Sequence, residues 1–261
     1  MLAASLLFSW PAGRLAAQTS DLVVRNELRV CADPANMPFS NQKGEGFENK
    51  IAELVGKTLD IPVTYYWFPQ STGFIRKTLG EKHCDVVIGY AQGHELVQNT
   101  NHYYSSAYVL ITRTPSDLSD VESLDDPRLK GRRIGLIAGT PPATNLAING
   151  LMGNVRPFHL NVDRRFHSPT EDMVKMIAEG ELDAGLLWGP IGGYYAKHAS
   201  KALKVTPLIR EKGGPRMIYR ITMGVRPTEQ DWKRELNRLI RKKQEEINRI
   251  LSDYGVPLID G

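Results

Sequence analysis

The sequence predicts an α/β fold made of two similar lobes. The first observation is a run of alternating strands and helices over residues 28–90. The second is a similar run over residues 133–189, and the third is an amphipathic segment, residues 229–251, that belongs to neither run. Each run can fold as one lobe, and two facing lobes enclose a cleft. We therefore expect a ligand or partner to bind between the lobes.

The elements of the first lobe follow from the spacing of its apolar residues. Residues 28–33 predict a short strand, and residues 47–59 carry apolar side chains at helical spacing. Residues 63–68 are rich in β-branched and aromatic types and predict a second strand, followed by a short helix over 73–80. The continuous apolar run 85–90 is typical of a parallel strand that is covered on both faces.

The connection between the lobes is expected just after the first run. Residues 103–112 alternate in polarity and predict a strand, and a polar stretch follows. We place the first crossover at residues 112–113 and the return crossover near residues 222–224, within the apolar segment 218–227. The predicted division is residues 18–112 with 223–261 for the first lobe and 113–222 for the second.

The second lobe begins with a strand at Arg133. Ser168-Pro169-Thr170-Glu171 has the pattern of a capping box with proline at the first helical position, and Gly180 is suited to end that helix. Two more strands are expected over residues 183–187 and 203–209.

The segment after the return crossover predicts a long amphipathic helix. Its apolar side is expected to pack on the first lobe, because no other element there remains to cover it. The opposite face carries basic residues, which fit either a solvated surface or a docking patch for an acidic partner. These residues are Arg234, Arg238, Arg241, Lys242 and Lys243.

The N-terminus resembles a secretory signal peptide. Residues 2–10 are apolar, and small residues precede Gln18, so we expect residues 1–17 to be removed and the mature protein to be periplasmic. A frayed apolar terminus is the alternative. No later apolar stretch is long enough to span a membrane. The net charge of +4, without basic runs interleaved with aromatics, argues against nucleic-acid binding.

The chain has two cysteines, Cys31 and Cys84, on strands predicted to be neighbours. Disulfides persist in exported proteins, which favours a bridge. However, Cys31 lies late on its strand and Cys84 at the start of its own, and a parallel alignment can leave such residues too far apart. A disulfide and two buried thiols are both compatible with the sequence. The spacing does not suggest a metal site.

Catalytic motifs are absent from the sequence. It has no GxSxG, HExxH or phosphate-loop pattern, and its six histidines lack metal-ligand spacing. Glu48 begins a helix, where a carboxylate is more often a partner of the helix dipole than a general base. We therefore expect a protein that is not an enzyme and that carries no metal and no cofactor.

Candidate binding residues follow from the position of the cleft. In open α/β sheets, the loops after the carboxyl ends of the strands line the ligand crevice. Thr140 either caps the helix that follows it or belongs to a helix start that binds a carboxylate or phosphate. The full set of candidates is Asp33, Asn36, Phe39, Phe68, Tyr90, Tyr108, Thr140, Thr144 and Trp188.

Four motifs of the first lobe are Cys31-Ala32-Asp33-Pro34, Gly46-Phe47-Glu48-Asn49, Gly73-Phe74-Ile75-Arg76 and Cys84-Asp85-Val86-Val87-Ile88-Gly89. The chain that carries them resembles the type II periplasmic solute-binding fold, in which two Rossmann-like lobes are joined by two crossover strands. Through these four motifs, a closer resemblance is to the MoxJ/XoxJ branch, substrate-binding-like proteins associated with quinoprotein methanol dehydrogenases.

The resemblance implies a periplasmic accessory factor. Such a factor binds a PQQ-dependent methanol dehydrogenase, or a segment of it, and supports its maturation or activation in methanol oxidation. The alternative is a solute receptor that delivers an unidentified small molecule to an ABC transporter.

The chain departs from amino-acid-binding members of this fold in two places. Those members carry an arginine after the third strand of the first lobe, whereas residues 92–100 contain none. They also carry an acidic residue where this chain has Trp188. A free amino acid would leave its charges unpaired, at a cost of roughly several kcal/mol. We expect an apolar or aromatic segment in the cleft, or a cleft adapted to protein contact.

Overall fold

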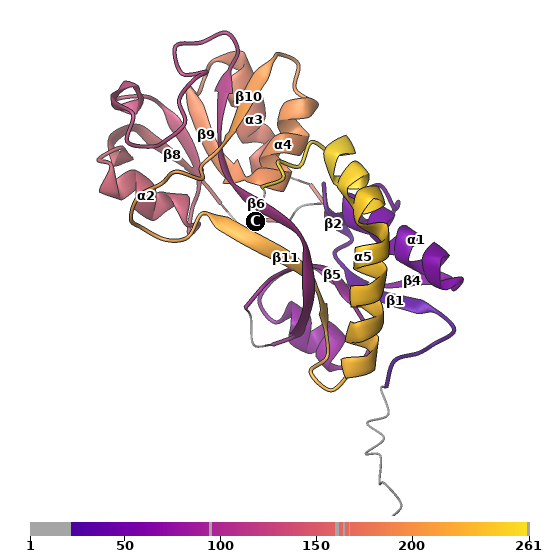
Figure 1. The fold of residues 1–261 in the computed structure, drawn as a ribbon. Coiled ribbons are helices and arrows are strands. Elements are labelled where there is room, and N and C mark those ends of the chain that lie inside the picture. The colour runs from indigo at the N-terminus through magenta and orange to yellow at the C-terminus, as the bar shows by residue number, and fades with distance from the viewer. Residues whose placement is uncertain (1–21, 94–95, 160–161, 164, 167, 260–261) are drawn as a thin grey trace, which may run out of the picture.

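A computed structural model describes residues 22–93, 96–159, 162–163, 165–166 and 168–259. The predicted signal peptide, residues 1–17, lies outside the described residues. Two lobes lie at opposite ends of a pair of long strands, and one long helix runs along the first lobe (Figure 1).

The first lobe contains the early strands and helix α1. Strand β1 (Leu28–Ala32) pairs in parallel with β4 (Val63–Trp67), and a bridge from Val30 to Val86 joins β1 to the segment that leads into β5 (Val87–Ala91). The helix α1 (Phe47–Leu59) has the predicted bounds and buries its apolar face in the lobe core. Smaller elements are β2 (Ala35–Asn36), β3 (Ser40–Asn41) and the π-helical turn η1 (Arg76–Gly80), which replaces the short helix predicted over 73–80.

The second lobe is built around strand β7 (Ile134–Ile137). This strand lies between β8 (Val155–Phe158) and β9 (Ala184–Trp188), parallel to both. Strand β10 (Leu203–Pro207) pairs with the long strand β6 (Gln98–Arg113), which completes the order β8-β7-β9-β6-β10. The helical elements are α2 (Pro142–Ile148), α3 (Pro169–Glu179), α4 (Gly189–Lys197), η2 (Pro127–Leu129) and η3 (Met152–Asn154).

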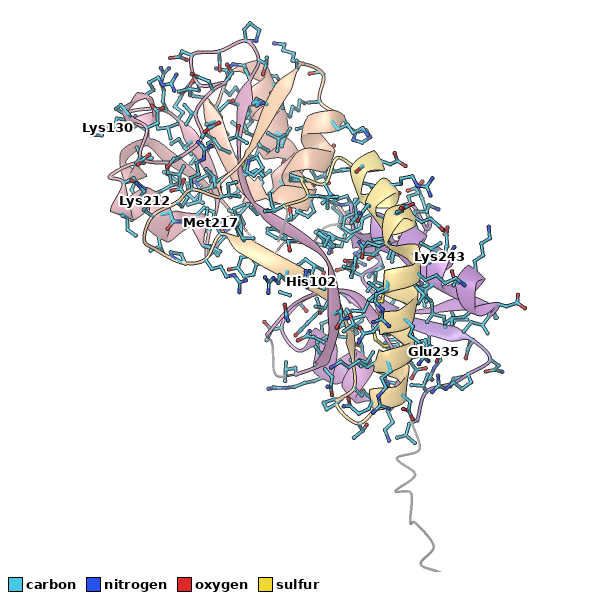
Figure 2. All side chains as sticks on the ribbon, in the orientation of Figure 1. His102, Lys130, Lys212, Met217, Glu235 and Lys243 are labelled. Carbon is cyan, nitrogen blue, oxygen red and sulfur yellow. A yellow bond between two sulfur atoms is a disulfide. The ribbon has the colours of Figure 1, made fainter. Side chains whose placement is uncertain are left out.

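Strands β6 and β11 (Ile218–Val225) connect the lobes. Residues up to Ala107 of β6 pair with β11, whereas residues from Tyr108 onward pair with β9 and β10. The change of partner thus precedes residues 112–113, where the sequence analysis placed the first crossover. The return also comes before Ile218 and not at 222–224, because within the described residues β11 pairs only with β5 and β6. The difference arises because β6 and β11 are continuous strands, and their periodicity does not record a change of partner. Figure 2 shows Met217 beside the second lobe and His102 beside the first.

Helix α5 (Gln230–Asp253) packs on α1 and β6 of the first lobe. Its outer face is basic and accessible: Arg234, Arg238, Arg241 and Lys242 are exposed, and Lys243 pairs with Glu246 at 2.7 Å. Figure 2 labels Lys243 and Glu235 on this helix. The buried face consists of Trp232, Leu236, Leu239, Ile240, Ile247 and Leu251.

Helix α4 was not predicted, because its glycines weaken both the helical pattern and the helical propensity. The structure uses one of these glycines for a close approach. A Cβ atom on Gly193 would lie 1.9 Å from the carbonyl oxygen of Gly255, so α4 packs tightly on the chain that follows α5. The first residue of α4 is also a glycine in a close contact: a Cβ atom on Gly189 would lie 2.5 Å from the carbonyl oxygen of Ala107, and Trp188 before it is the N-cap residue.

Cys31 and Cys84 form a disulfide with Cα atoms 5.4 Å apart. The pairing of β1 explains why the bridge forms. The backbone N–H of Cys31 donates to the carbonyl oxygen of Val86 at 2.9 Å, so the chain just before β5, rather than β5 itself, lies beside the end of β1. This offset brings the two cysteines within bridging distance.

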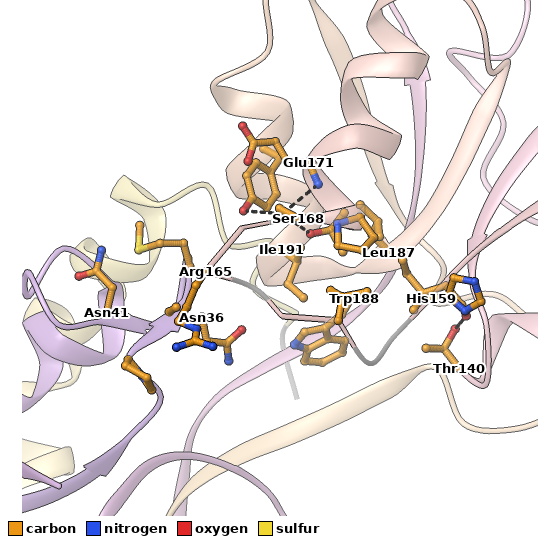
Figure 3. Close-up of a pocket in the computed structure, with 18 of the residues that line it drawn as sticks. Asn36, Asn41, Thr140, His159, Arg165, Ser168, Glu171, Leu187, Trp188 and Ile191 are labelled. Carbon is orange, nitrogen blue, oxygen red and sulfur yellow. Dashed lines mark hydrogen bonds between the residues drawn. The ribbon is translucent and has the colours of Figure 1, made fainter. Parts of the chain in front are cut away.

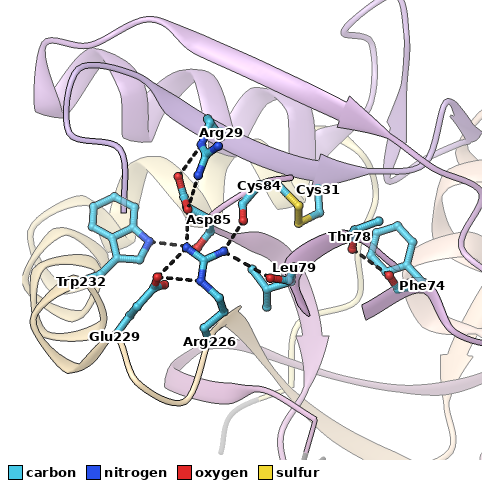
Figure 4. The surroundings of a disulfide bond; sticks show 10 residues. All are labelled: Arg29, Cys31, Phe74, Thr78, Leu79, Cys84, Asp85, Arg226, Glu229 and Trp232. Atoms are coloured by element: carbon cyan, nitrogen blue, oxygen red, sulfur yellow. Dashed lines mark hydrogen bonds and ion pairs between the residues drawn. A yellow bond between two sulfur atoms is a disulfide. The ribbon is translucent and has the colours of Figure 1, made fainter. Parts of the chain in front are cut away.

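A buried ionic cluster adjoins the disulfide (Figure 4). The Arg226 guanidinium donates to the carboxylate of Asp85, to the carboxylate of Glu229 at 2.6 Å and to the carbonyl oxygen of Cys84 at 2.5 Å. Arg29 also donates to Asp85, at 2.7 and 2.8 Å. Arg226, Asp85 and Glu229 are all buried. The cluster connects the chain just after β11 to β1 and to the segment before β5, the two parts of the first lobe that carry the cysteines.

Candidate functional site

A cavity of about 580 Å³ lies between the lobes. We call it the outer cavity. The first lobe contributes residues 34–37 and 41–43 to it, and the second contributes Thr140, His159, Arg165, residues 168–171, Trp188, Ile191 and Tyr195, among others. Figure 3 shows Asn36 and Asn41 on one side of this space and Thr140, Ser168 and Trp188 on the other.

The start of helix α3 forms part of the second-lobe wall. Ser168 Oγ accepts a hydrogen bond from the backbone N–H of Glu171 at 3.4 Å, as the capping pattern predicted, and lies 3.2 Å from the hydroxyl oxygen of Tyr195. Arg165 pairs with Asp163 at 2.6 Å, which lowers the pKa of that carboxyl group.

A second pocket, of about 390 Å³, adjoins the outer cavity through Tyr108 and Trp188. We call it the inner pocket. The Trp188 ring lies 5.4 Å from the Tyr108 ring and 5.7 Å from the Tyr219 ring between centroids, and each pair is tilted edge to face. Such contacts hold large side chains in fixed positions. The lining residues are Phe39, Glu48, Gln70, Gly89, Tyr90, Ala91, Tyr104, Tyr108, Pro141, Trp188, Tyr219 and Ile221.

The inner pocket also contains a carboxyl group, that of Glu48. The backbone N–H of Glu48 donates to the carbonyl oxygen of Phe39 at 2.9 Å, which fixes the start of α1 against the loop after β1. The carboxyl group rests on β5, where a Cβ atom on Gly89 would lie 1.9 Å from Glu48 Oε1. Burial, with a smaller contribution from Asp33, raises the pKa of Glu48 to about 8.

The sequence pattern indicates a partner of the helix dipole at Glu48, which is not among the predicted site residues. The available signal was Gly89, since a glycine inside an otherwise apolar strand often marks a close approach by another group.

The raised pKa of Glu48 should make the free energy of unfolding depend on pH, and the variant Glu48→Gln tests this. The pKa rises from 4.5 to about 8 on folding, so the stabilisation that comes from the proton is complete below about pH 4.5 and is lost as the pH passes about 8. We expect the unfolding free energy of the wild type to fall relative to Glu48→Gln across this range. Urea unfolding of both proteins at several pH values measures the difference. Glu45→Gln, at an exposed position, is the control. If the unfolding free energies of the wild type and Glu48→Gln differ by the same amount at every pH, the raised pKa of Glu48 is contradicted.

Most of the predicted site residues lie in these two spaces. Asn36 and Thr140 line the outer cavity, Phe39 and Tyr90 line the inner pocket, and the side chains that line both are Tyr108 and Trp188.

The remaining candidates line neither space. Asp33 is buried and accepts hydrogen bonds from the backbone N–H groups of Ala35 at 2.8 Å and Gln70 at 2.6 Å, so it holds two loops together. Phe68 turns toward Phe74 in a separate core cluster, and Thr144 is exposed on α2. Their positions after strand ends suggested the cleft, but the local turns direct these side chains elsewhere.

Thr140 does not cap α2 with its side chain. Its hydroxyl donates to the carbonyl oxygen of Ile137 at 2.6 Å, and α2 begins after Pro141 without a side-chain cap. Thr140 thus stabilises the turn that ends β7.

The described residues contain neither a metal-ligand cluster nor a helix suited to span a membrane. Within the described ranges, no group of three or more His, Cys, Asp or Glu residues is arranged to hold a metal ion. In the same ranges, none of the helices combines the length and apolar character that crossing a membrane requires.

The comparisons with known proteins decide the family. No known family model matches the sequence. The protein MoxJ of Methylorubrum extorquens is 30% identical over 247 residues, which cover 89% of this chain and 81% of MoxJ. The chain belongs to the MoxJ family.

Solved structures agree with this family. The periplasmic binding protein XoxJ from Methylobacterium extorquens AM1 is 43% identical with a TM-score of 0.77, covering 90% of this chain and 100% of XoxJ. MxaJ from Methlophaga aminisulfidivorans MPT is 27% identical with a TM-score of 0.76, covering 89% and 100% of the two chains. The predicted bilobal α/β fold is therefore confirmed as the type II periplasmic binding protein fold, and the relationship indicates a periplasmic location.

The site of this MoxJ-family chain makes a prediction about small ligands. We expect no measurable binding of the standard free amino acids, because residues 92–100 contain no arginine that could pair with the ligand carboxylate. Calorimetric titration with each amino acid is the measurement. A dissociation constant tighter than about 10 μM for any of them would contradict the prediction.

Proposed function

We propose that the protein is a periplasmic accessory factor that binds a PQQ-dependent methanol dehydrogenase, or a segment of it, and supports its maturation or activation. Membership of the MoxJ family and the similarity to XoxJ and MxaJ support this assignment.

The observation that carries the proposal is the aromatic junction between the two cavities. Tyr108 and Trp188 line both spaces, and Trp188 also packs against Tyr219. Aromatic side chains in a concave, partly desolvated site typically provide most of the energy of protein binding. The outer cavity opens beside this junction, and its volume suits a few side chains of an inserted segment.

The proposal predicts that Trp188→Ala weakens binding to the dehydrogenase by about 2 kcal/mol, or about thirtyfold, because truncation of an aromatic anchor typically costs this much. Surface plasmon resonance with the purified dehydrogenase measures the change, after the fold of the variant is checked by circular dichroism.

Trp67→Ala is the matched control for this experiment. Trp67 is a partly buried tryptophan of the first lobe, stacked on Tyr65 with centroids 4.6 Å apart, and lines neither cavity. We expect it to lose stability but to keep its affinity. Unchanged affinity in Trp188→Ala would exclude the aromatic junction as the contact and would direct attention to the basic face of α5. If instead a small molecule binds tightly and the dehydrogenase does not, the protein is a solute receptor.

A further inference from the structure

The inner pocket combines aromatic rings with a single charged residue. Among the described residues that line it, six are aromatic and Glu48 alone is ionised or ionisable near neutral pH; no Lys, Arg or His is present. Electron-rich aromatic rings around a carboxyl group are the arrangement that binds organic cations, because both components attract positive charge.

We propose that the inner pocket binds an organic ammonium group, held between the Glu48 carboxylate and the rings of Tyr108, Trp188 and Tyr219. The inference concerns the inner pocket alone, and it does not depend on which protein enters the outer cavity.

No cation in the described part of the chain already neutralises Glu48. Among residues 22–93, 96–159, 162–163, 165–166 and 168–259, no hydrogen bond or ion pair involves its side chain. The groups in these ranges that interact with it electrostatically are Asp33, Tyr65, Tyr103 and Tyr104. Asp33 lies after β1, Tyr65 on β4, and the other two tyrosines on β6. Since none of these is positively charged, a cation brought into the pocket would supply the missing partner.

The rings and the carboxyl group approach the pocket from both lobes. Glu48 and Phe39 belong to the first lobe, whereas Trp188 ends β9 of the second. The Arg216 guanidinium lies 5.7 Å from the centroid of the Tyr219 ring, but Arg216 lines a different cavity. An ammonium group in the inner pocket would thus contact both lobes at once.

Gly89 makes room for this arrangement. Its missing side chain leaves the carboxyl group of Glu48 lying against β5, at the edge of the pocket, whereas any Cβ atom would displace the Glu48 oxygen. The position of the acid is therefore built into the strand and does not depend on a flexible surface residue.

The test uses choline as a permanently charged probe and dimethylbutanol as its uncharged isostere. At about pH 9, where Glu48 is ionised, calorimetry should show that choline binds at least tenfold more tightly than dimethylbutanol. This is roughly the discrimination expected of an aromatic cage with a carboxylate. Choline affinity should also rise roughly tenfold from about pH 7 to about pH 9, because binding needs the ionised form of a group whose pKa is about 8. Equal binding of the two probes, or no binding of choline at millimolar concentration, would overturn the proposal.

Variants separate the charge from the rings. Glu48→Gln should lose the pH dependence and weaken choline binding at least tenfold, whereas the exposed control Glu45→Gln should leave both unchanged. Tyr219→Leu should weaken choline while Glu48 stays intact, so the proposal remains testable if Glu48→Gln folds poorly. Unaltered choline affinity in both site variants would overturn the assignment.

A final arm identifies the source of the ammonium group. Lysine capped at both ends presents its side chain as a protein would, and tighter binding of this compound than of choline would indicate a protein lysine. The reverse order would indicate a free small cation. Either order supports an ammonium site.

Discussion

Arg226→Ala should lower the free energy of unfolding by about 4 kcal/mol, because removal of one partner from a buried ion pair leaves the other charges without compensation. Arg226 is 7% exposed and lies between two buried carboxylates, those of Asp85 and Glu229. Without the guanidinium, Asp85 keeps only Arg29 as a cationic partner within the cluster described here. Urea denaturation of the wild type and the variant at neutral pH measures the loss.

Arg234→Ala is the control for this prediction. Arg234 pairs with Asp231 on the exposed face of α5, where an ion pair typically contributes less than about 1 kcal/mol. Similar small losses in both variants would show that the Arg226 cluster does not hold the first lobe together.

Removal of the disulfide should have an effect of similar size. The bridge joins residues 53 positions apart, and closure of a loop of that length stabilises a protein by about 4 kcal/mol in the chain-entropy model. We expect the double variant Cys31→Ser, Cys84→Ser to lose this amount in urea denaturation, because its unfolded state is no longer restricted. Addition of a reductant should destabilise the wild type but not the double variant. A loss below about 1 kcal/mol, or equal sensitivity to the reductant, would contradict the prediction.

Local patterns predicted the elements whose signals lie within one segment. The helical spacing over residues 47–59 gave the bounds of α1, and the sequence around Ser168 gave the start of α3. These signals are local, because apolar periodicity and capping act within a few turns of the chain.

The features that were missed depend on contacts between distant segments. The lobe crossover falls at Ala107 and Tyr108 because the strands that pair with β6 change there, which its own periodicity does not show. Helix α4 begins at Gly189, after Trp188 as its N-cap, and packs on the chain near Gly255.

The site was predicted only in part, because it too depends on contacts between distant segments. Tyr108 and Trp188, two of the predicted cleft residues, line the space between the lobes, and Trp188 was predicted from its position at a strand end. Strand-end positions did not distinguish Asp33 from Glu48. The carboxylate of Asp33 accepts hydrogen bonds within its own loops, whereas the carboxyl group of Glu48 reaches the pocket across β5. Which polar group remains without a partner depends on the whole fold, and the order of residues in the chain does not reveal it.

The proposed function requires that the cleft binds a methanol dehydrogenase through its aromatic junction. Immobilised wild-type protein and Trp188→Ala should be incubated with a periplasmic extract of methanol-grown cells, and the retained proteins quantified by mass spectrometry. The proposed function predicts that the wild type retains the dehydrogenase and that Trp188→Ala retains far less of it. Equal retention by the two proteins, or no dehydrogenase on the wild type, would contradict the claim.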